Sequence, residues 1–264
     1  MESLTLLTYS HSEYSDVWPL VIDGINKIPK LLSRIFACNT NTVNMDDIYR
    51  AYNNVVLYND ILTYPQKLIY ILSHVNTPYV LLMHDIDICI NLDPRKLDSL
   101  MNAIKEYKIE RCIFGMISKQ ERLIEVDDIL LTNANNSNIS SCFYTPYDVG
   151  VSIYETKFLI KIMTEFYTIS YRDIEFCGIQ SFIKSSNIWA FTPTQSCLPI
   201  FQIGRPYSNY FTFIHILIRG KWLEPKYYMD LEDIFIKLII KYDIDINIRG
   251  IIQSNHIDIN MLRV

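Results

Sequence analysis

Residues 79–90, YVLLMHDIDICI, hold the stretch of sequence that decides the fold. The five apolar residues at 79–83 predict a buried strand, because branched and aromatic side chains are concentrated in a short run. The run stops at His84, and Asp85 and Asp87 follow where the strand ends. Two like charges are costly to bury there unless a cation lies between them. The pattern therefore predicts a site for Mg²⁺ or Mn²⁺, which carboxylates, waters and phosphate oxygens suit.

The same aspartates also fit a simpler structure. The strand could end in a polar turn, with Asp87 or Asp93 capping the helix that follows. The context favours the metal site, because ligand sites of sheets built from alternating strands and helices collect at the carboxyl ends of the strands.

The rest of the chain alternates predicted strands and helices. Short apolar runs predict strands at 4–9, 34–38, 54–58, 111–117, 144–154 and 188–191. Apolar residues at helical spacing predict helices at 19–28, 64–73, after Pro94, and at 155–166, 172–184 and 231–242. This order predicts an α/β fold with a mostly parallel central sheet, helices on both of its faces and an irregular C-terminal segment.

Two local features are also expected. Ser15 or Asp16 is expected to cap the first helix, in which Pro19 falls in the first turn. The segments 39–47 and 131–141 are polar and are predicted to be loops, the second of them mobile.

Composition narrows the function classes. The chain has 264 residues, half of them apolar, and a net charge of −5, which argues against broad nucleic-acid binding. Its six cysteines form no C-x-x-C pair, which favours reduced thiols. No signal peptide and no membrane span is apparent, so a cytoplasmic, soluble protein is expected.

Four stretches resemble the nucleotide-sugar-dependent glycosyltransferases of the GT-A type, in particular small bacterial and viral members. They are LTLLTYSHSEYSDVWP at 4–19, TYPQKLIYILSHVNTPYVLLMHDID at 63–87, FYTPYDVGVSIYETKFL at 143–159 and HILIRGKW at 215–222. The resemblance implies a single Rossmann-like GT-A domain at 1–222, with a C-terminal helix and tail at 223–264 packed on it. It implies transfer of a sugar from a nucleoside diphosphate, most simply a UDP-sugar, to a hydroxyl of a glycan or other acceptor.

The resemblance also implies roles for particular residues. Asp85 would reach the ribose or the sugar and contribute to the metal site, Asp87 would bind Mn²⁺ or Mg²⁺, and His215 is a candidate third ligand. The remaining candidates for holding the nucleotide sugar are Tyr9, Ser10, Lys67 and Lys221. Each also has a structural alternative: a strand-end residue for Tyr9 and Ser10, a solvated lysine for Lys67 and Lys221, and a core histidine for His215.

The base that would deprotonate the acceptor is assigned to Asp173 or Glu175, with Asp148 as a further alternative. The chain reads YRDIE at 171–175, which departs from the Trp-x-Glu or Glu-Asp pair of the family. Asp173 is favoured, because it would project from the start of a helix, although both acids would also suit helix capping. The loop at 131–141 is expected to act as a lid or to contact the acceptor.

Three other functions share parts of this pattern. Phosphatases with D-x-D-x-[TV] carry the motif on their first strand, with Thr or Val at its fifth position. Here the fifth position is Cys89. Sugar-nucleotide nucleotidyltransferases need a Gly-rich N-terminal loop with basic residues, and 10–16 contains no Gly, Lys or Arg. A binding module that keeps the fold without the activity remains a separate alternative.

Overall fold

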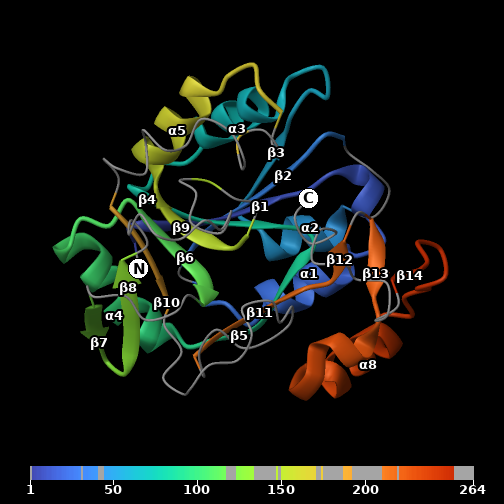
Figure 1. Ribbon diagram of the computed structural model, residues 1–264. Helices are drawn as coiled ribbons and strands as arrows, with labels where there is room; N and C mark the ends of the chain where they lie inside the picture. Colours follow the sequence, from blue (N-terminus) through green and yellow to red (C-terminus); the bar gives the residue numbers. More distant parts are fainter. Residues whose placement is uncertain are drawn as a thin grey trace.

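The fold is given by a computed structural model, which describes residues 2–30, 32–40, 45–116, 123–133, 147, 150–170, 174, 187–191, 210–218 and 220–252. Among these residues, nine strands form a central sheet in the order β3-β2-β1-β4-β9-β6-β10-β8-β7 (Figure 1). All of them except β9 and β8 run in one direction. The strands are β1 (Leu4–Tyr9), β2 (Ser33–Cys38), β3 (Asn54–Leu57), β4 (Tyr79–His84), β6 (Arg111–Met116), β7 (Leu123–Val126), β8 (Ile129–Asn133), β9 (Ser152–Glu155) and β10 (Ile188–Phe191).

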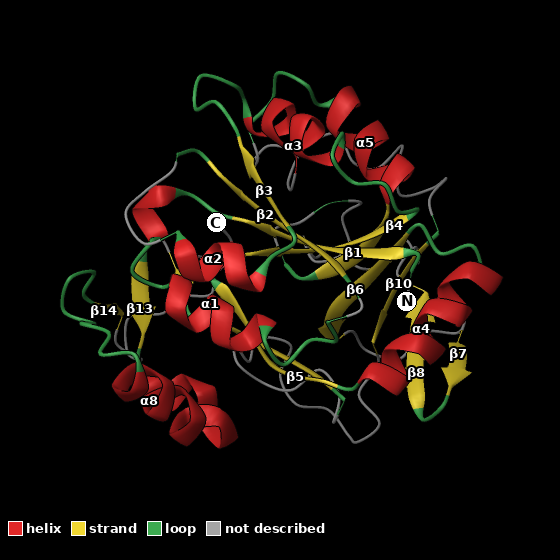
Figure 2. Cartoon of the chain, turned by 180° about the vertical axis from the view of Figure 1, so that it is seen from behind, coloured by secondary structure: helices red, strands yellow, loops and turns green. Residues whose placement is uncertain are grey.

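Helices cover both faces of this sheet (Figure 2). One face packs against α3 (Tyr64–Leu72) and α5 (Thr156–Glu165). The other packs against α1 (Trp18–Ile25), α2 (Asp46–Ala51) and α4 (Pro94–Glu106). The predicted α/β class with a mostly parallel sheet is confirmed.

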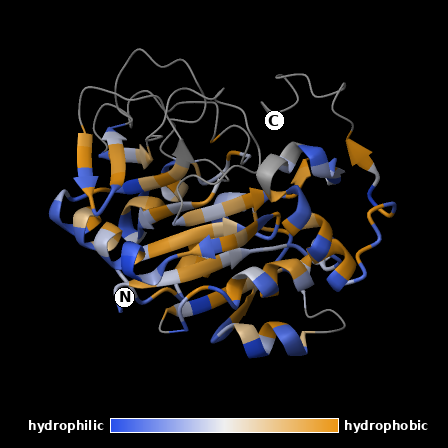
Figure 3. Cartoon of the chain, turned by 90° about the horizontal axis from the view of Figure 1, so that it is seen from below, coloured by the Kyte–Doolittle hydropathy of each residue, from blue (hydrophilic) through white to orange (hydrophobic). Residues whose placement is uncertain are grey.

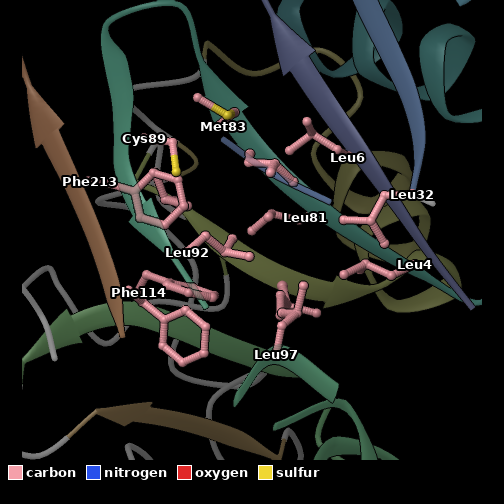
Figure 4. Packing of buried hydrophobic residues seen from close by; sticks show 14 of the residues in the cluster. Leu4, Leu6, Leu32, Leu81, Met83, Cys89, Leu92, Leu97, Phe114 and Phe213 are labelled. Carbon is pink, nitrogen blue, oxygen red and sulfur yellow. The ribbon is translucent and has the colours of Figure 1, made fainter. Parts of the chain in front are cut away.

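The apolar run at 79–83 is buried on both sides. Val80 and Leu82 of β4 join the cluster beneath α3 and α5, whereas Leu81 and Met83 join the cluster on the opposite face. Because successive side chains of a strand face opposite ways, a strand covered on both faces needs apolar residues at every position. Figure 4 shows Leu81 and Met83 directed into the second cluster, together with Leu4 and Leu6 of β1 and with Cys89 and Phe213. Figure 3 shows the central strands coloured largely as hydrophobic.

The strand order reverses between β1 and β4. The chain builds β1, β2 and β3 outward in one direction and then crosses back, so that β4 pairs with the other side of β1. Tyr9 at the end of β1 is level with His84 at the end of β4. Ligands of open α/β sheets bind outside the carboxyl ends of the strands at such a switch point. Asp85, the first residue after β4, therefore lies at the position where this fold binds ligands.

A second sheet of two strands carries Asp87. After a two-residue turn at Asp85 and Ile86, the chain enters β5 (Asp87–Leu92), which pairs antiparallel with β11 (Phe211–His215). In this pairing Asp87 stands directly opposite His215. A Cβ at Gly24 of α1 would lie 2.8 Å from the carbonyl oxygen of Cys89, so only glycine lets α1 approach β5 so closely.

The C-terminal elements form a third layer around α1 and β5. β12 (Leu217–Ile218), β13 (Lys221–Leu223) and β14 (Ile251–Ile252) make a small sheet. Along the chain, η3 (Pro225–Leu231) and α8 (Glu232–Lys241) connect β13 to β14. Residues from α1, β5, β11, β13 and α8 share one buried cluster. Among the described helices, none combines the length and the apolar character needed to cross a membrane. The division of the chain at 222 stays a prediction.

Several local predictions need correction. α1 begins at Trp18 with Val17 as its N-cap, and no side chain caps it, so the assignment of Ser15 or Asp16 as the cap was wrong. The predicted loop at 39–47 ends in the first turn of α2. Asp93 does cap α4, accepting the backbone N–H groups of Arg95 and Lys96. The predicted helix at 172–184 lies outside the described residues, apart from Ile174.

Candidate functional site

Asp85 is held at the switch point by one of its two carboxylate oxygens. Oδ2 accepts the Ser10 hydroxyl at 2.5 Å and the His11 backbone N–H at 3.2 Å. The Ser10 hydroxyl in turn accepts the indole N–H of Trp18 at 2.7 Å. Among the described residues Oδ1 of Asp85 has no hydrogen-bond partner. The side chain is thus oriented by the chain and still offers one acceptor.

The charge of Asp85 is poorly solvated. Burial raises the pKa of Asp85 to about 7, against the hydrogen bonds from Ser10 and His11, which lower it, and the neighbouring Asp87 raises it further. Burial likewise lowers the pKa of His84 to about 4, so this imidazole brings no positive charge to the carboxylates at neutral pH. The His84 ring instead bonds to the Tyr64 hydroxyl at 3.2 Å. Among the described residues, no basic side chain forms an ion pair with Asp85, and a bound metal or basic group would stabilise its charge.

Asp87 forms a pair with His215 across the two-stranded sheet. Nδ1 of His215 lies 2.9 Å from Oδ1 of Asp87, and Oδ2 of Asp87 accepts the His84 backbone N–H at 3.4 Å. Asp87 is 4% exposed, whereas the His215 side chain is 30% exposed. The structure thus brings Asp87 and His215 into contact, and their predicted role as metal ligands stays a prediction.

The Asp87–His215 pair fits a divalent cation. Two neighbouring ligands of an octahedral ion, each at about 2.1 Å, stand about 3.0 Å apart. Oδ1 of Asp87 and Nδ1 of His215 are separated by 2.9 Å, which is close to that spacing. The described part of the chain contains no group of three or more His, Cys, Asp or Glu side chains suited to a metal. The protein would therefore supply two ligands, and water and phosphate oxygens the others, as is common for Mg²⁺-like ions.

Tyr9, expected to hold the nucleotide, lies in an aromatic cluster at the ends of β1 and β3. Its ring stacks on the Tyr58 ring, with 5.3 Å between the centroids. It also contacts the Tyr64 ring edge to face and the His84 ring at a tilted angle. The Tyr58 hydroxyl donates to the backbone carbonyl of Ser10 at 2.5 Å. The cluster thus supports the backbone that holds Asp85, and burial raises the pKa of Tyr9 to about 12.

Lys67 is part of a polar group at the ends of β1, β2 and β3. Its ammonium lies 3.0 Å from Oδ1 of Asp60 and 5.0 Å from the centre of the Tyr58 ring. The other oxygen of Asp60 accepts Asn39 at 2.7 Å and lies 3.5 Å from Nε2 of His11. The ion pair places Lys67 at the same edge of the sheet as Asp85, in the company of three polar residues that the sequence did not single out.

Lys221 is exposed at the start of β13, and no interaction with the aspartates or with His215 is found among the described residues. Asp173, Glu175 and Asp148 lie outside the described residues, as does most of the loop at 131–141. Their assigned roles stay predictions.

Arg249 was missed by the sequence analysis. It comes from the turn before β14 and binds Asp16 through Nε at 2.7 Å and through a second, shorter contact from its terminal nitrogen. Its guanidinium also lies over the Tyr14 ring, 4.7 Å from the centroid, and lowers the pKa of Asp85 electrostatically. The C-terminal segment therefore brings a positive charge to the N-terminal side of the site. A lone Arg in a polar tail carries no local sequence signal that would have revealed this.

Comparisons with known proteins give only distant similarities. No family model and no curated protein matches the chain. The Staphylococcus aureus TarS 1–349 crystal structure is 13% identical, with a TM-score of 0.49, covering 74% of this chain and 59% of that one. The same fragment with UDP-GlcNAc is 13% identical, with a TM-score of 0.46 over 94% of this chain and 69% of that one. A Leptospira borgpetersenii cytidylyltransferase is 11% identical, with a TM-score of 0.45 over 92% and 96% of the two chains. In the first alignment the chain spans about three fifths of the length of TarS 1–349. At these values the similarities carry no argument about activity.

Proposed function

We propose that the protein is a metal-dependent glycosyltransferase that transfers a sugar from a nucleoside diphosphate, with UDP-sugars as the donor class, to a hydroxyl acceptor. The observation that carries the proposal is the Asp87–His215 pair, whose Oδ1 and Nδ1 atoms are 2.9 Å apart. Asp87 follows Asp85 by two residues, and Asp85 lies at the point where the strand order reverses. This position is where α/β sheets bind nucleotides.

Asp85 would bind the donor directly. Its Oδ2 is fixed by Ser10 and His11, so its Oδ1 is presented in one orientation to a hydroxyl donor such as a ribose or sugar hydroxyl. A preoriented acceptor loses little side-chain entropy on binding. Ser10 is thereby a positioning residue for Asp85.

Asp87 and His215 would hold the divalent ion. When bound, the ion would supply positive charge beside the leaving diphosphate. The imidazole ligand favours Mn²⁺ over Mg²⁺, because Mg²⁺ takes oxygen ligands almost exclusively. Lys67, which is paired with Asp60, and Arg249, which is paired with Asp16, would contribute further positive charge toward phosphate oxygens. Lys221 is kept as a candidate of the same kind.

The acceptor base is assigned as before, to Asp173 or Glu175 with Asp173 favoured. An inverting transfer needs this carboxylate within about 2.6–3.2 Å of the acceptor hydroxyl.

Sugar-nucleotide hydrolysis with and without Mn²⁺ tests the proposal. The chain is incubated with UDP-, GDP- and dTDP-sugars, and release of the free nucleoside diphosphate is followed by chromatography. We expect UDP-sugar hydrolysis that stops when EDTA is added. A thermal-shift series in parallel should show stabilisation of about 2.7 kcal/mol at a donor concentration of 100 Kd.

Two outcomes would replace the proposal. Pyrophosphate formed from a nucleoside triphosphate and a sugar 1-phosphate would identify a nucleotidyltransferase. If the chain neither hydrolyses nor binds a donor in the presence of Mn²⁺, it is a binding module without this activity.

A further inference from the structure

The first helix reaches Asp85 through a single hydroxyl group. Trp18, the first residue of α1, donates its indole N–H to Oγ of Ser10 at 2.7 Å, and Oγ of Ser10 lies 2.5 Å from Oδ2 of Asp85. The three residues are buried, with exposed fractions of 3%, 1% and 5%. Hydrogen bonds in such a low-dielectric setting are stronger than in water and polarise one another. The three side chains therefore act as one chain of hydrogen bonds that begins in α1.

The indole of Trp18 decides where the Ser10 proton points. A hydroxyl has one proton and two lone pairs, whereas an indole can only donate. Oγ of Ser10 accepts from Trp18 and keeps its single proton for another acceptor. Two acceptors are near, Oδ2 of Asp85 at 2.5 Å and the backbone carbonyl of His11 at 3.5 Å. Because the distance to His11 is at the limit for a hydrogen bond, the proton goes to Asp85.

The backbone of Ser10 is held independently of Trp18. Its N–H donates to the carbonyl of Ala37 at 2.8 Å, and its carbonyl accepts the Tyr58 hydroxyl at 2.5 Å. The Trp18 ring is itself fixed by the Phe36 ring, which it meets edge to face with 5.1 Å between the centroids. Removing the indole N–H alone would thus leave the Ser10 backbone in place and release only the rotation of its side chain.

We propose that Trp18 is a positioning residue for Asp85, acting through the Ser10 hydroxyl, and thereby for the donor that Asp85 would bind. The indole N–H holds the Ser10 side chain in the rotamer whose proton meets Oδ2, which leaves Oδ1 of Asp85 as the oxygen for a ligand hydroxyl. A carboxylate ordered before binding loses less entropy when the ligand arrives. The effect on the donor rests on the proposed function, whereas the orientation of Asp85 is a property of the free chain.

The same helix also contacts the strand of the second acid. Gly24, in the last turn of α1, packs against the backbone of Cys89 in β5, the strand that begins with Asp87. Trp18 lies at the opposite end of α1. A single helix thus fixes Asp85 at one end and the strand of Asp87 at the other, so it sets the two carboxylates relative to each other.

Nuclear magnetic resonance on the full chain, without nucleotide or metal, tests the orientation of Asp85. The three-bond couplings from Cγ to the backbone nitrogen and to the carbonyl carbon report whether its χ1 angle occupies one rotamer or several. We expect one rotamer in the natural chain. Trp18→Phe keeps a ring against Phe36 and removes the N–H, so the Asp85 couplings should average over several rotamers.

A double substitution tests whether Trp18 acts through the hydroxyl. Ser10→Ala removes the bond to Asp85 directly and should average the same couplings. Adding Trp18→Phe to Ser10→Ala should then change the Asp85 couplings no further, because the group through which the indole acts is already gone.

Trp189→Phe is the matched control. It also removes an indole N–H that donates to a side chain at 2.7 Å, that of Asn187, but it does so from β10. The Asp85 couplings should stay as in the natural chain. Asp93, whose carboxylate accepts two backbone N–H groups at the start of α4, should keep its couplings in every variant and so shows that each is folded.

Calorimetric titration with UDP and Mn²⁺ measures the effect on the donor. Ordering one side chain on binding should weaken the UDP affinity of Trp18→Phe about 2- to 10-fold, relative to the natural chain and to Trp189→Phe. If the natural chain binds no UDP, the proposed function fails, and the couplings still decide whether Trp18 positions Asp85.

Three results would overturn the proposal. One is a single Asp85 rotamer in Trp18→Phe. Another is a further change of the Asp85 couplings when Trp18→Phe is added to Ser10→Ala, which would mean that the indole supports Asp85 by another route. The third is an equal loss of UDP affinity in Trp18→Phe and Trp189→Phe, which would indicate a general loss of stability.

Discussion

Asp87 is the residue on which the proposed ion site depends most. Replacing it with Asn keeps the size and removes the charge that pairs with His215 at 2.9 Å. Loss of a group that only orients a metal ligand commonly weakens metal binding 10- to 100-fold, so loss of a direct ligand should weaken it by about 100-fold or more. We expect Asp87→Asn to lose Mn²⁺-dependent nucleotide binding, measured by titration calorimetry with UDP.

Asp93→Asn is the matched control for this change. It removes the same charge from the other end of β5, where Asn also caps a helix well. Nucleotide affinity in Asp93→Asn should stay as in the natural chain. Equal losses in the two variants would argue for a general charge effect and against the ion site.

Asp85 should make the stability of the metal-free protein depend on pH. Burial raises the pKa of Asp85 from 3.8 to about 7, so the folded chain holds this proton over a range in which the unfolded chain has released it. The contribution of Asp85 to stability therefore falls as pH rises from about 4 to about 7, by an amount on the order of 4 kcal/mol at most.

Asp85→Asn removes this titration. In urea unfolding with EDTA present, the stability of Asp85→Asn relative to the natural chain should rise between pH 4 and pH 8. A difference that stays constant over this range would show that Asp85 does not titrate as described.

At the scale of single residues, sequence reasoning found the acids and missed their partners. Asp85 and Asp87 stand out because a charged pair interrupts an apolar run, which is visible within ten residues. Arg249 binds Asp16, 233 positions earlier, and such a pairing is decided by the path of the whole chain. The same holds for Asp60, which contacts Lys67 of α3, Asn39 after β2 and His11 after β1.

At the scale of elements, the contact of α1 with β5 sets the position of Asp87. A methyl group at Gly24 would lie 2.8 Å from the carbonyl oxygen and 2.9 Å from the nitrogen of Cys89, both of them backbone atoms. Backbone cannot move aside as a side-chain end does, so overpacking here should cost about 1–3 kcal/mol. The better helix propensity of Ala would offset at most about 1 kcal/mol of this cost.

Gly24→Ala is therefore expected to lower the free energy of unfolding and to weaken Mn²⁺-dependent nucleotide binding, because β5 carries Asp87. Thermal unfolding and calorimetry measure the two effects. A more stable variant with unchanged nucleotide affinity would show that α1 and β5 separate freely.

Strands and helices of the central sheet were predictable because their patterns are local. β10 is a continuous apolar run, β1 and β4 are largely apolar, and α3 and α5 carry apolar residues at helical spacing. β5 was not predicted, because DICINL reads as the end of the preceding strand and its partner β11 is more than a hundred residues away. α2 was missed because its short run DDIYRA follows a polar segment.

At the scale of the whole molecule, Asp23 joins the first helix to the last. Its carboxylate binds Lys241 and the Tyr242 hydroxyl, each at 2.6 Å, and Lys27 at 2.9 Å. Burial alone would raise the pKa of Asp23, but these bonds outweigh it and lower the pKa to about 2. The stabilisation is thus present above about pH 4 and is lost as pH falls toward 2.

We expect Asp23→Asn to destabilise the protein at pH 6 and to flatten the loss of stability between pH 4 and pH 2, measured by urea unfolding. Asp47→Asn is the control, because among the described residues Asp47 pairs only with Arg50 at the surface. If the free energy of unfolding of Asp23→Asn and of Asp47→Asn changes in the same way between pH 4 and pH 2, the link between α1 and α8 does not contribute to stability.

The architecture of the molecule was predictable from the sequence, whereas the closing of the site was not. Alternating strands and helices are enough to place a D-x-D at the carboxyl edge of a sheet. The layer that returns to this edge, from β11 to Arg249, has short strands and irregular connections. Its contacts with α1 and β5 are long-range, so no local sequence pattern indicates them.

The pairing of β5 with β11 also has a consequence for the timing of biosynthesis. Asp87 and His215 are separated by 128 residues, and a ribosome adding 5–20 residues per second needs about 6 to 26 s to cover that distance. Throughout this interval the nascent chain carries Asp87 without its imidazole partner. If Asp87 and His215 hold the proposed ion, translation itself sets the earliest moment at which that site can be complete.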